Sequence, residues 1–393
     1  MNKVILFKGE IETLEYFSLE IAKTFQEHGI SVFVFDFLNE EESFADLTEF
    51  CKDASPIMIT FNFTGIRGDE IFYEEDGQLF WNTHKIPCIN IVVDHPFYYD
   101  KLLGIVPDNY WQISIDRQHE AYLKRFYPHI KLLPFLPLGG TSIPEGTLPI
   151  GERSTDVVFT GNYTPPETFN VHIERLGDEY TAFYHGIIED LITNPSLSME
   201  KAMESHLVKE LGNLSTQDLR AAMANMIFID LYVRFYYRGL VVKTLAEHGI
   251  PVQLYGSGWE KLDCKCPKNL LIGGPLNSHE CLQAISRSKI SLNVMPWFKD
   301  GAHDRIFNSQ LNGAVCLTDD SIYLREQLTD GKDCVFYNLK NINTLPELIR
   351  TLLDNEEKMI YIADCGYQTA SASHSWKQRA EMLILYANSL VNS

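Results

Sequence analysis

Short, uninterrupted runs of apolar residues recur along the first third of the chain, with stretches of helical periodicity between them. Such runs predict strands at residues 4–7, 31–35, 56–61, 88–93, 110–115 and 130–135. Residues 14–28 have apolar side chains at helical spacing and end at Gly29, a common helix stop. Strands that are apolar throughout and separated by helices are typical of a parallel sheet covered on both faces. We therefore expect a Rossmann-like domain over residues 1–138.

A second domain of the same kind is expected after a segment rich in glycine and proline, residues 139–153, which we interpret as a linker. The second domain spans residues 154–375 in this interpretation, with a helical insertion at about 165–235 and one helical pattern running from Leu219 past Ala246. Its strands are expected at 156–160, 251–255, 270–272, 290–295 and 314–317, its helices at 278–288 and 322–328, and a C-terminal helix at 376–393. Two such domains would face each other across a ligand cleft at the carboxyl ends of their strands.

Composition excludes several classes of partner. Acidic residues outnumber basic ones by 53 to 33, which gives a formal net charge of -20. Such a chain repels phosphate backbones and anionic lipid, so neither nucleic acid nor a membrane surface is an expected partner. No apolar run reaches the roughly 18 residues of a transmembrane helix, and polar residues follow the first apolar run too soon for a signal peptide. The 8 cysteines show no disulfide or zinc spacing, so we expect a cytoplasmic protein without a metal site.

Glycines follow several strands of the second domain at the end where a ligand would bind. Gly161 follows one strand, Gly256 and Gly258 the next, and Gly274 with Pro275 a third. A glycine at this position lets backbone N–H groups approach a phosphate closely, and the N-terminus of the following helix favours the same anion. The alternative is that these are ordinary turn glycines.

The segment 300–319 carries the strongest signal in the sequence. A polar loop leads into a short helix, then Gly313, then a buried strand that ends in Asp319. Arg305 would lie near the start of this helix, where a diphosphate could meet both a guanidinium group and the helix dipole. The alternative is a surface pair of Asp304 and Arg305 without a function.

In the first domain, a buried strand ends directly in Asp94 and His95, followed by Pro96 and three aromatic residues. A general base would lie at such a strand end, so either side chain could take a proton from an acceptor, and the aromatic residues at 97–99 could pack against sugar rings. The alternative is that Asp94 caps the following turn and the aromatic residues belong to the core. The stretch 64–68 is a further candidate border of the cleft, or a plain loop.

Several of these motifs together resemble the spore-maturation CgeB-type glycosyltransferases, which have the GT-B fold. The resemblance rests on the run Arg305-Ile306-Phe307-Asn308, then Gly313, Leu317-Thr318-Asp319 and Arg325-Glu326-Gln327-Leu328, and on the stretches 331–335, 156–163 and 253–259. It covers about residues 154–163 and 236–390. The N-terminal half matches in architecture only.

The resemblance implies a site for a nucleotide-sugar donor in the second domain. Gly161 and Asn162 would face the pyrophosphate, Arg238 and Arg305 would be its cationic partners, and Tyr255, Gly256 and Gly274-Pro275 would border the nucleoside. The full donor-binding set is Gly161, Asn162, Tyr163, Arg238, Tyr255, Gly256, Gly258, Gly274, Pro275, His303, Asp304, Ile306, Phe307, Asn308 and Asp319, and the expected catalytic residues are Asp94, His95 and Arg305. Related enzymes have a ribose-binding glutamate where this chain has Asn308, which can donate and accept hydrogen bonds but carries no charge.

The function that this resemblance implies is hexosyltransferase-like: transfer of a sugar from a nucleoside diphosphate to a glycan, protein or surface polymer. Neither a metal ion nor a cofactor is expected, because arginines and helix dipoles can stabilise the leaving diphosphate. Two alternatives stay open. One is a sugar-nucleotide epimerase or hydrolase of the same fold. The other is a non-catalytic binding protein that uses the helical insertion as its partner surface, and the insertion is also where we expect any homo-oligomer to form.

Overall fold

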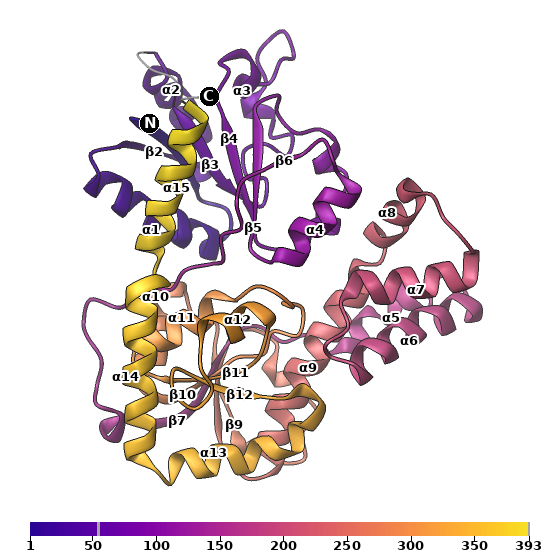
Figure 1. Ribbon diagram of the computed structural model, residues 1–393, viewed down its shortest axis with the longest axis vertical. Helices are drawn as coiled ribbons and strands as arrows, with labels where there is room; N and C mark the ends of the chain where they lie inside the picture. The colour runs from indigo at the N-terminus through magenta and orange to yellow at the C-terminus, as the bar shows by residue number, and fades with distance from the viewer. Residues whose placement is uncertain (53–55, 392–393) are drawn as a thin grey trace. The chain divides into compact units, whose positions relative to one another are not determined.

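The computed structural model describes residues 1–52 and 56–391. The chain forms two compact units, each built on its own six-stranded parallel sheet (Figure 1). The first unit contains Met1–Gly139 and the stretch that begins at His374, and the second unit is Gly140–Ser373. The chain thus enters the second unit at the start of the segment expected to be a linker, and residues 140–153 belong to that unit.

The sheet of the first unit has the strand order β2-β1-β3-β4-β5-β6. Its strands are β1 (Lys3–Lys8), β2 (Ser31–Asp36), β3 (Ile57–Phe61), β4 (Cys88–Val92), β5 (Tyr110–Ser114) and β6 (Lys131–Leu132). Every residue of β3 and β4 is buried, which is why the sequence shows them as continuous apolar runs. Strand β6 ends at Leu132, earlier than predicted, because Pro134 follows and has no N–H to donate to the sheet.

The helices of the first unit include the C-terminal one. They are α1 (Glu12–Glu27), α2 (Glu40–Phe50), α3 (Phe80–Thr83), α4 (Arg117–Phe126) and α15 (Trp376–Val391), with short 3-10 turns at Phe37–Asn39, Glu70–Phe72, Pro96–Tyr99 and Leu102–Gly104. Figure 1 shows α15 alongside α1. The Phe17 and Trp376 rings pack with their centroids 4.6 Å apart. The last helix is therefore part of the first unit's core rather than a separate element.

The sheet of the second unit has the strand order β12-β11-β10-β7-β8-β9. Its strands are β7 (Thr155–Thr160), β8 (Val252–Tyr255), β9 (Leu270–Gly274), β10 (Ser288–Leu292), β11 (Val315–Asp319) and β12 (Val335–Tyr337). The strands pair in parallel, so their carboxyl ends meet along one edge of the sheet. The loops after β7, β8 and β10 and the end of β11 therefore lie at the same edge.

Helices surround this second sheet. They are α10 (Ser278–Ser286), α11 (Asp304–Leu311), α12 (Ile322–Gln327), α13 (Leu345–Leu353) and α14 (Glu356–Ser373), with 3-10 turns at Ile150–Glu152, Pro166–Phe169, Trp259–Lys261, Pro267–Asn269 and Leu339–Thr344. The start of α10 is fixed by a capping box: Asn277 accepts from the Glu280 N–H and Glu280 accepts from the Asn277 N–H.

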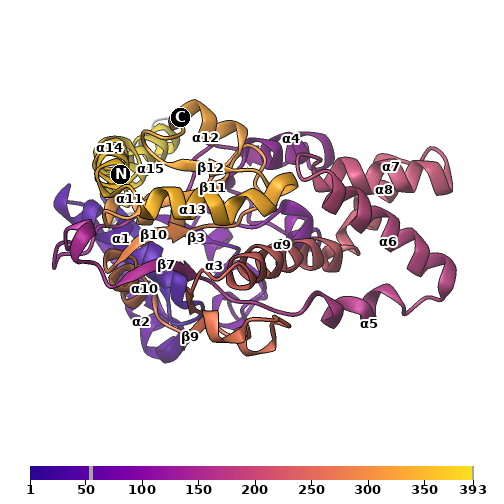
Figure 2. The ribbon, with the colours of Figure 1, turned by 90° about the horizontal axis from the view of Figure 1, so that it is seen from below.

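The helical insertion is present between β7 and β8, where every residue is described and none lies in a strand. It contains α5 (Asn170–Ile173), α6 (Asp178–Thr193), α7 (Met199–Leu211) and α8 (Thr216–Ala224), and α9 (Ile227–Glu247) leads from it to the sheet (Figure 2). The prediction of one helical pattern from Leu219 past Ala246 is wrong in its continuity. The helix is interrupted at Asn225, which follows the last residue of α8. The Asn225 side-chain amide donates to the Ala221 carbonyl at 2.8 Å.

Within the described residues, no helix is both long and apolar enough to cross a membrane.

Candidate functional site

Arg305 is the centre of the candidate site. It is the second residue of α11, and its side chain lies under the carboxyl end of β7 with 7% of the residue exposed. Its Nη1 donates to the Thr160 carbonyl at 2.7 Å, and the guanidinium carbon lies 5.4 Å from the centre of the Phe159 ring. Nε and Nη2 are buried and have no hydrogen-bond partner among the described residues. Two donors of a buried cation are thus left for a ligand.

Gly161 makes room for this guanidinium group. A Cβ atom built at Gly161 would lie 2.5 Å from Arg305 Nη1, closer than any real contact permits. A side chain at position 161 would therefore displace the guanidinium group, and the backbone φ of +154° also favours glycine. The contact brings together two of the residues that the sequence assigned to the pyrophosphate.

Arg238 of α9 is a second buried cation, and its side chain contacts the loop that follows β7. It is 8% exposed, its Nη1 donates to the Asn162 carbonyl at 2.9 Å, and its Nε has no partner among the described residues. Burial and then the charge of Arg305 lower the pKa of Arg238 well below its usual value. Two positive charges that affect one another in this way are poised for an anion.

A third arginine reaches the same region from the preceding turn of α9. Arg234 pairs with Asp230 at 2.9 Å, and its guanidinium carbon lies 4.2 Å from the centre of the Trp297 ring. The Arg238 guanidinium carbon lies 5.0 Å from the same ring. Trp297 belongs to the loop after β10, so this ring links α9 to the edge of the sheet. Sequence reasoning missed Arg234 and Trp297. The available signal for Arg234 was its four-residue spacing from Arg238, which places the two arginines on one helix face.

Two ionisable residues directly precede Arg305 in the chain. His303 caps α11, with Nδ1 accepting from the Arg305 N–H at 3.3 Å, and burial followed by the charge of Arg305 lowers the pKa of His303 to about 4. The imidazole is therefore neutral at pH 7. Burial opposes ionisation of Asp304, but His303 and Arg305 hold the pKa of Asp304 below its usual value. The alternative of a surface pair is not observed, because Asp304 and Arg305 are both buried.

Asp319 ends β11 at the same edge of the sheet. Its Oδ1 accepts from the Met295 N–H at 2.8 Å, which fixes the start of the loop that carries Trp297 and His303. Burial raises the pKa of Asp319 to about 7. Asp319 therefore positions the loop, and it contributes less negative charge than an exposed carboxylate would.

The loops after β7 and β8 are hydrogen-bonded to each other. The Ser257 N–H donates to Asn162 Oδ1 and the Tyr163 N–H donates to the Ser257 carbonyl, both at 2.9 Å. A Cβ at Gly256 would lie 2.4 Å from the Gly161 carbonyl oxygen, and one at Gly258 would lie 2.0 Å from that of Tyr163. These two glycines are needed for contact between the loops, so packing accounts for them without a ligand.

Four other predicted donor contacts lie in different environments. The Tyr163 ring stacks on Trp259, with centroids 5.1 Å apart. Tyr255 is half-buried and packs against the core cluster around Val158. Gly274 has a φ of +80° with open space where a Cβ would point, and the neighbouring Pro275 is exposed. Contact of these residues with a nucleoside stays a prediction.

Ile306 and Phe307 require a correction. Both are 0% exposed and belong to the core beneath α11, so their side chains cannot contact a donor. Helix α11 packs on the sheet, and a helix that does so buries apolar residues on the side that faces the sheet. This packing accounts for Ile306 and Phe307 in the run Arg305-Ile306-Phe307-Asn308.

Asn308 makes two side-chain hydrogen bonds within the protein. Its Nδ2 donates to Asp304 Oδ2 and its Oδ1 accepts from the Thr141 N–H, both at 2.9 Å. The segment that follows Gly140 lies directly on α11: a Cβ at Gly140 would lie 2.6 Å from the Phe307 carbonyl carbon. An amide can donate to Asp304 whereas an ionised glutamate cannot, which gives Asn308 a structural role. Contact of Asn308 with a donor stays a prediction.

In the first unit, Asp94 and His95 follow β4 as predicted. Asp94 Oδ2 accepts from Asn62 Nδ2 at 3.1 Å and from the Tyr99 hydroxyl at 3.2 Å. His95, rather than Asp94, caps the turn that follows: its Nδ1 accepts from the Phe97 N–H at 3.2 Å. Phe97 is a core residue, whereas Tyr98 and Tyr99 are half-buried. Asp94 is thus held by two donors at the carboxyl edge of the sheet, and a catalytic role for either residue stays a prediction.

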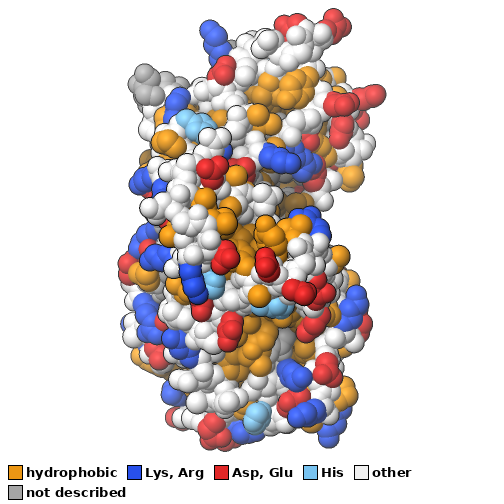
Figure 3. Space-filling model, turned by 90° about the vertical axis from the view of Figure 1, so that its right-hand side faces the viewer, with side chains coloured by type: hydrophobic (Ala, Val, Ile, Leu, Met, Phe, Trp, Pro, Cys, Tyr) orange, Lys and Arg blue, Asp and Glu red, His pale blue; other side chains and the backbone are white. Residues whose placement is uncertain are grey.

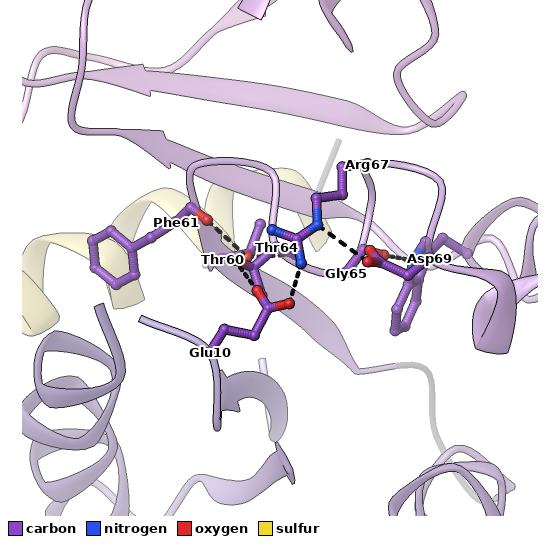
Figure 4. Close-up of polar contacts among 8 residues, drawn as sticks. Glu10, Thr60, Phe61, Thr64, Gly65, Arg67 and Asp69 are labelled. Atoms are coloured by element: carbon purple, nitrogen blue, oxygen red, sulfur yellow. Dashed lines mark hydrogen bonds and ion pairs between the residues drawn. The ribbon is translucent and has the colours of Figure 1, made fainter. Parts of the chain in front are cut away.

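A polar cluster joins the loops after β1 and β3 at that edge (Figure 4). Glu10 accepts from the Thr64 hydroxyl at 3.1 Å and pairs with Arg67, which also pairs with Asp69 at 3.2 Å. The sequence singled out 64–68 as a candidate border but missed Glu10 and Asp69. The available signal was the position of Glu10, two residues after the end of a buried strand.

Across residues 1–52 and 56–391, no group of three or more His, Cys, Asp or Glu side chains is arranged to share a metal ion.

Comparisons with known proteins agree with this architecture. Residues 238–384 match the family described as glycosyl transferase-like. The sucrose-phosphate synthase of Thermosynechococcus elongatus aligns over 100% of both chains, with a TM-score of 0.55 and 12% identity. Anabaena HepE in complex with UDP-glucose aligns over 98% of this chain and 99% of its own, with a TM-score of 0.53 and 11% identity.

A third solved structure, the DNA-modifying enzyme β-glucosyltransferase, aligns over 99% of both chains with a TM-score of 0.57 and 11% identity. A comparison with curated protein sequences gives no match. The two parallel sheets and the full-length alignments establish a GT-B fold of the kind found in glycosyltransferases, and the part of the chain that carries Arg238 and Arg305 matches the glycosyl transferase-like family.

Proposed function

We propose that this protein transfers a sugar from a nucleoside diphosphate sugar to an acceptor, and that Arg305 and Arg238 bind the diphosphate. The observation that carries the proposal is the pair of buried Arg305 donors, Nε and Nη2, that have no partner among the described residues. Burying a polar donor without a hydrogen-bond partner is costly, on the order of 1–3 kcal/mol. An anionic ligand at this position removes that cost, and a diphosphate can accept from both arginines at once.

The location of the site supports a leaving-group role for the diphosphate. Arg305 lies in the first turn of α11, whose N-terminus carries partial positive charge. When the bond between the sugar and the diphosphate breaks, negative charge grows on the phosphate oxygens. Fixed guanidinium groups would stabilise that charge without reorganising, and this is the basis on which we propose a reaction that needs neither a metal ion nor a cofactor.

For the acceptor step we assign Asp94 as the candidate base, and His95 as the residue that shapes its turn. Asp94 is held by Asn62 and Tyr99, which is the kind of support that keeps a base in a fixed orientation. A carboxylate there could take the proton of an acceptor hydroxyl if the anomeric centre is inverted. The acceptor class that we propose is a glycan, a protein or a surface polymer.

UDP-glucose is the first donor to test, because it is the ligand of the structurally similar HepE. The alternatives of an epimerase, a hydrolase or a non-catalytic binding protein are less well supported, since the family match and the similar structures are glycosyltransferases. We also propose a cytoplasmic location, because the cysteines are all free and a reducing compartment keeps them so.

The proposal is tested by thermal shift with a panel of UDP, GDP, ADP and CDP and their sugars, using the full chain. A ligand that binds only the native state raises the melting temperature, so one diphosphate should stabilise the protein. Arg305→Ala should abolish that shift, whereas Arg325→Ala, which removes an exposed arginine paired with Asp320, should keep it. The absence of a shift with every nucleotide would support the non-catalytic alternative, and consumption of the donor without an acceptor would support the hydrolase or epimerase.

A further inference from the structure

The helical insertion contains an apolar groove that takes no part in the donor site. The groove lies between α6, α7 and the junction of α8 with α9, and its volume is about 330 Å³. That volume lies near the lower end of the roughly 300–1,000 Å³ found for ligand pockets, so it suits a few side chains rather than a large cofactor. Its apolar lining includes Tyr180, Phe183, Tyr184, Leu207, Leu211 and Met226.

The apolar residues of the groove are arranged for a helix. On α6 they occur at Tyr180, Phe183 and Tyr184, and on α7 at Leu207 and Leu211, so both walls present side chains at helical spacing. Tyr180 is 52% exposed and Leu211 62% exposed, which leaves a large apolar surface in contact with water. An amphipathic helix that places its own apolar side chains between two such walls would bury this surface.

The rim of the groove is acidic. Glu179 and Glu210 line it, and none of the lysines or arginines that the structure describes does. Residues 170–224, which form α5 to α8, contain nine acidic and four basic residues. Figure 3 shows this face of the molecule, where hydrophobic side chains lie among charged ones of both signs. The surface thus combines an apolar centre with a negative border.

This combination selects the occupant by charge. An anionic membrane and a nucleic acid are repelled by the rim. A second copy of this chain would bring an equally acidic insertion against the first, and like charges placed face to face oppose binding. Lysine or arginine residues beside apolar anchors would instead meet Glu179 and Glu210.

We propose that the groove of the insertion binds a basic amphipathic helix of a partner protein, with apolar anchors between α6 and α7 and cationic residues at the Glu179 and Glu210 rim. The proposal does not depend on the proposed donor chemistry, because none of its residues belongs to the donor site. We expected any homo-oligomer to form at the insertion. In this proposal the same surface binds a different protein, which is cationic.

The test uses the full-length protein and a labelled synthetic helical peptide of leucine and lysine, with leucine at positions i, i+3, i+4 and i+7. Fluorescence anisotropy should show binding, and a peptide with glutamate in place of every lysine should bind at least about tenfold more weakly. Leu211→Gln and the double variant Glu179→Lys/Glu210→Lys should each weaken binding of the lysine peptide about tenfold or more, because central apolar anchors and the complementary charges both contribute.

Matched variants control for non-specific attraction to an acidic chain. Leu385→Gln removes a leucine that is 67% exposed on α15, and Glu189→Lys reverses an exposed charge on α6 outside the groove. Both should bind the peptide as the wild type does. Hydrogen exchange should also slow on peptide binding at residues 180–184 and 207–211.

Equal peptide affinity of Leu211→Gln, Leu385→Gln and the wild type would overturn the proposal, as would equal binding of the acidic peptide. Two further results would assign the groove to another occupant and also overturn it. One is a dimer in sedimentation velocity that Leu211→Gln dissociates. The other is sedimentation with vesicles of anionic phospholipid that Leu211→Gln abolishes. Melting curves of each variant show whether a loss of binding reflects a loss of fold.

Discussion

The side-chain amide of Asn308 donates a 2.9 Å hydrogen bond to the carboxylate of Asp304, one turn earlier in α11. The same amide accepts from the Thr141 N–H, so one side chain joins the start of the helix to the segment that lies across it. This arrangement needs a donor at position 308. It accounts in physical terms for an asparagine at the position where the resemblance to CgeB-type enzymes implies a glutamate.

Asn308→Asp should therefore destabilise the protein although it barely changes the shape of the side chain. A carboxylate at 308 would face that of Asp304, and repulsion would raise the folded-state pKa of the pair above its unfolded value. The loss should be about 1–3 kcal/mol at pH 7.5 and should shrink as the pH falls, because the folded state then takes up the extra proton. Urea unfolding at pH 7.5 and 5 measures it, with the exposed Asn341→Asp as the control. Equal stabilities of variant and wild type at both pH values would contradict this role of Asn308.

Gly161→Ala tests the contact between the backbone and Arg305. The added methyl group would lie 2.5 Å from Nη1 and would force the guanidinium group to move. Loss of one charged hydrogen bond to a diphosphate is worth about 1.5–3 kcal/mol, so UDP affinity should fall roughly tenfold or more. Gly331→Ala is the matched control, since Gly331 also has a positive φ but open space around it. It should cost stability without changing the affinity measured by calorimetry. Unchanged UDP binding by Gly161→Ala would mean that Arg305 does not contact the diphosphate.

The sequence predicts the architecture better than it predicts the site. Strands β3 and β4 could be found because every position is buried, whereas β12 was missed because three residues carry too little pattern. The site depends on contacts between residues far apart in the chain. Arg305 bonds to Thr160, 145 residues earlier, and no local pattern reveals that its guanidinium group packs on Gly161. The sequence could name both residues, but it could not distinguish Arg305, which keeps buried donors without a partner among the described residues, from the apolar core residues Ile306 and Phe307.

His374 should make the stability of the protein depend on pH. Burial and then the charge of Arg379, whose Nη2 lies 3.1 Å from the imidazole Nδ1, lower the pKa of His374 to about 4 from the usual 6.5. Between these values the unfolded chain binds a proton that the folded chain does not, so stability falls as the pH drops from about 6.5 toward 4. His374→Gln keeps an acceptor for Arg379 and removes the titration. Relative to this variant, the wild type should lose melting temperature between pH 7 and pH 5, and parallel curves for the two proteins would show that His374 does not titrate in this way.

A bound diphosphate should raise the pKa of His303 from its value of about 4. The imidazole is neutral because of burial and the charge of Arg305, and a nearby anion would favour its protonated form. Histidine NMR titrations with and without UDP measure this change. The signals of His206, which pairs with Asp190 on the insertion, serve as the internal control and should not move. A His303 titration that UDP leaves unaltered would place the nucleotide away from the start of α11.

The most direct test of the central claim is a crystal structure of the protein with UDP bound. The account predicts phosphate oxygens within about 3 Å of Nε or Nη2 of Arg305 and of Nε of Arg238, the donors that have no partner among the described residues. A diphosphate bound elsewhere, with these donors still buried and without a partner, would contradict it.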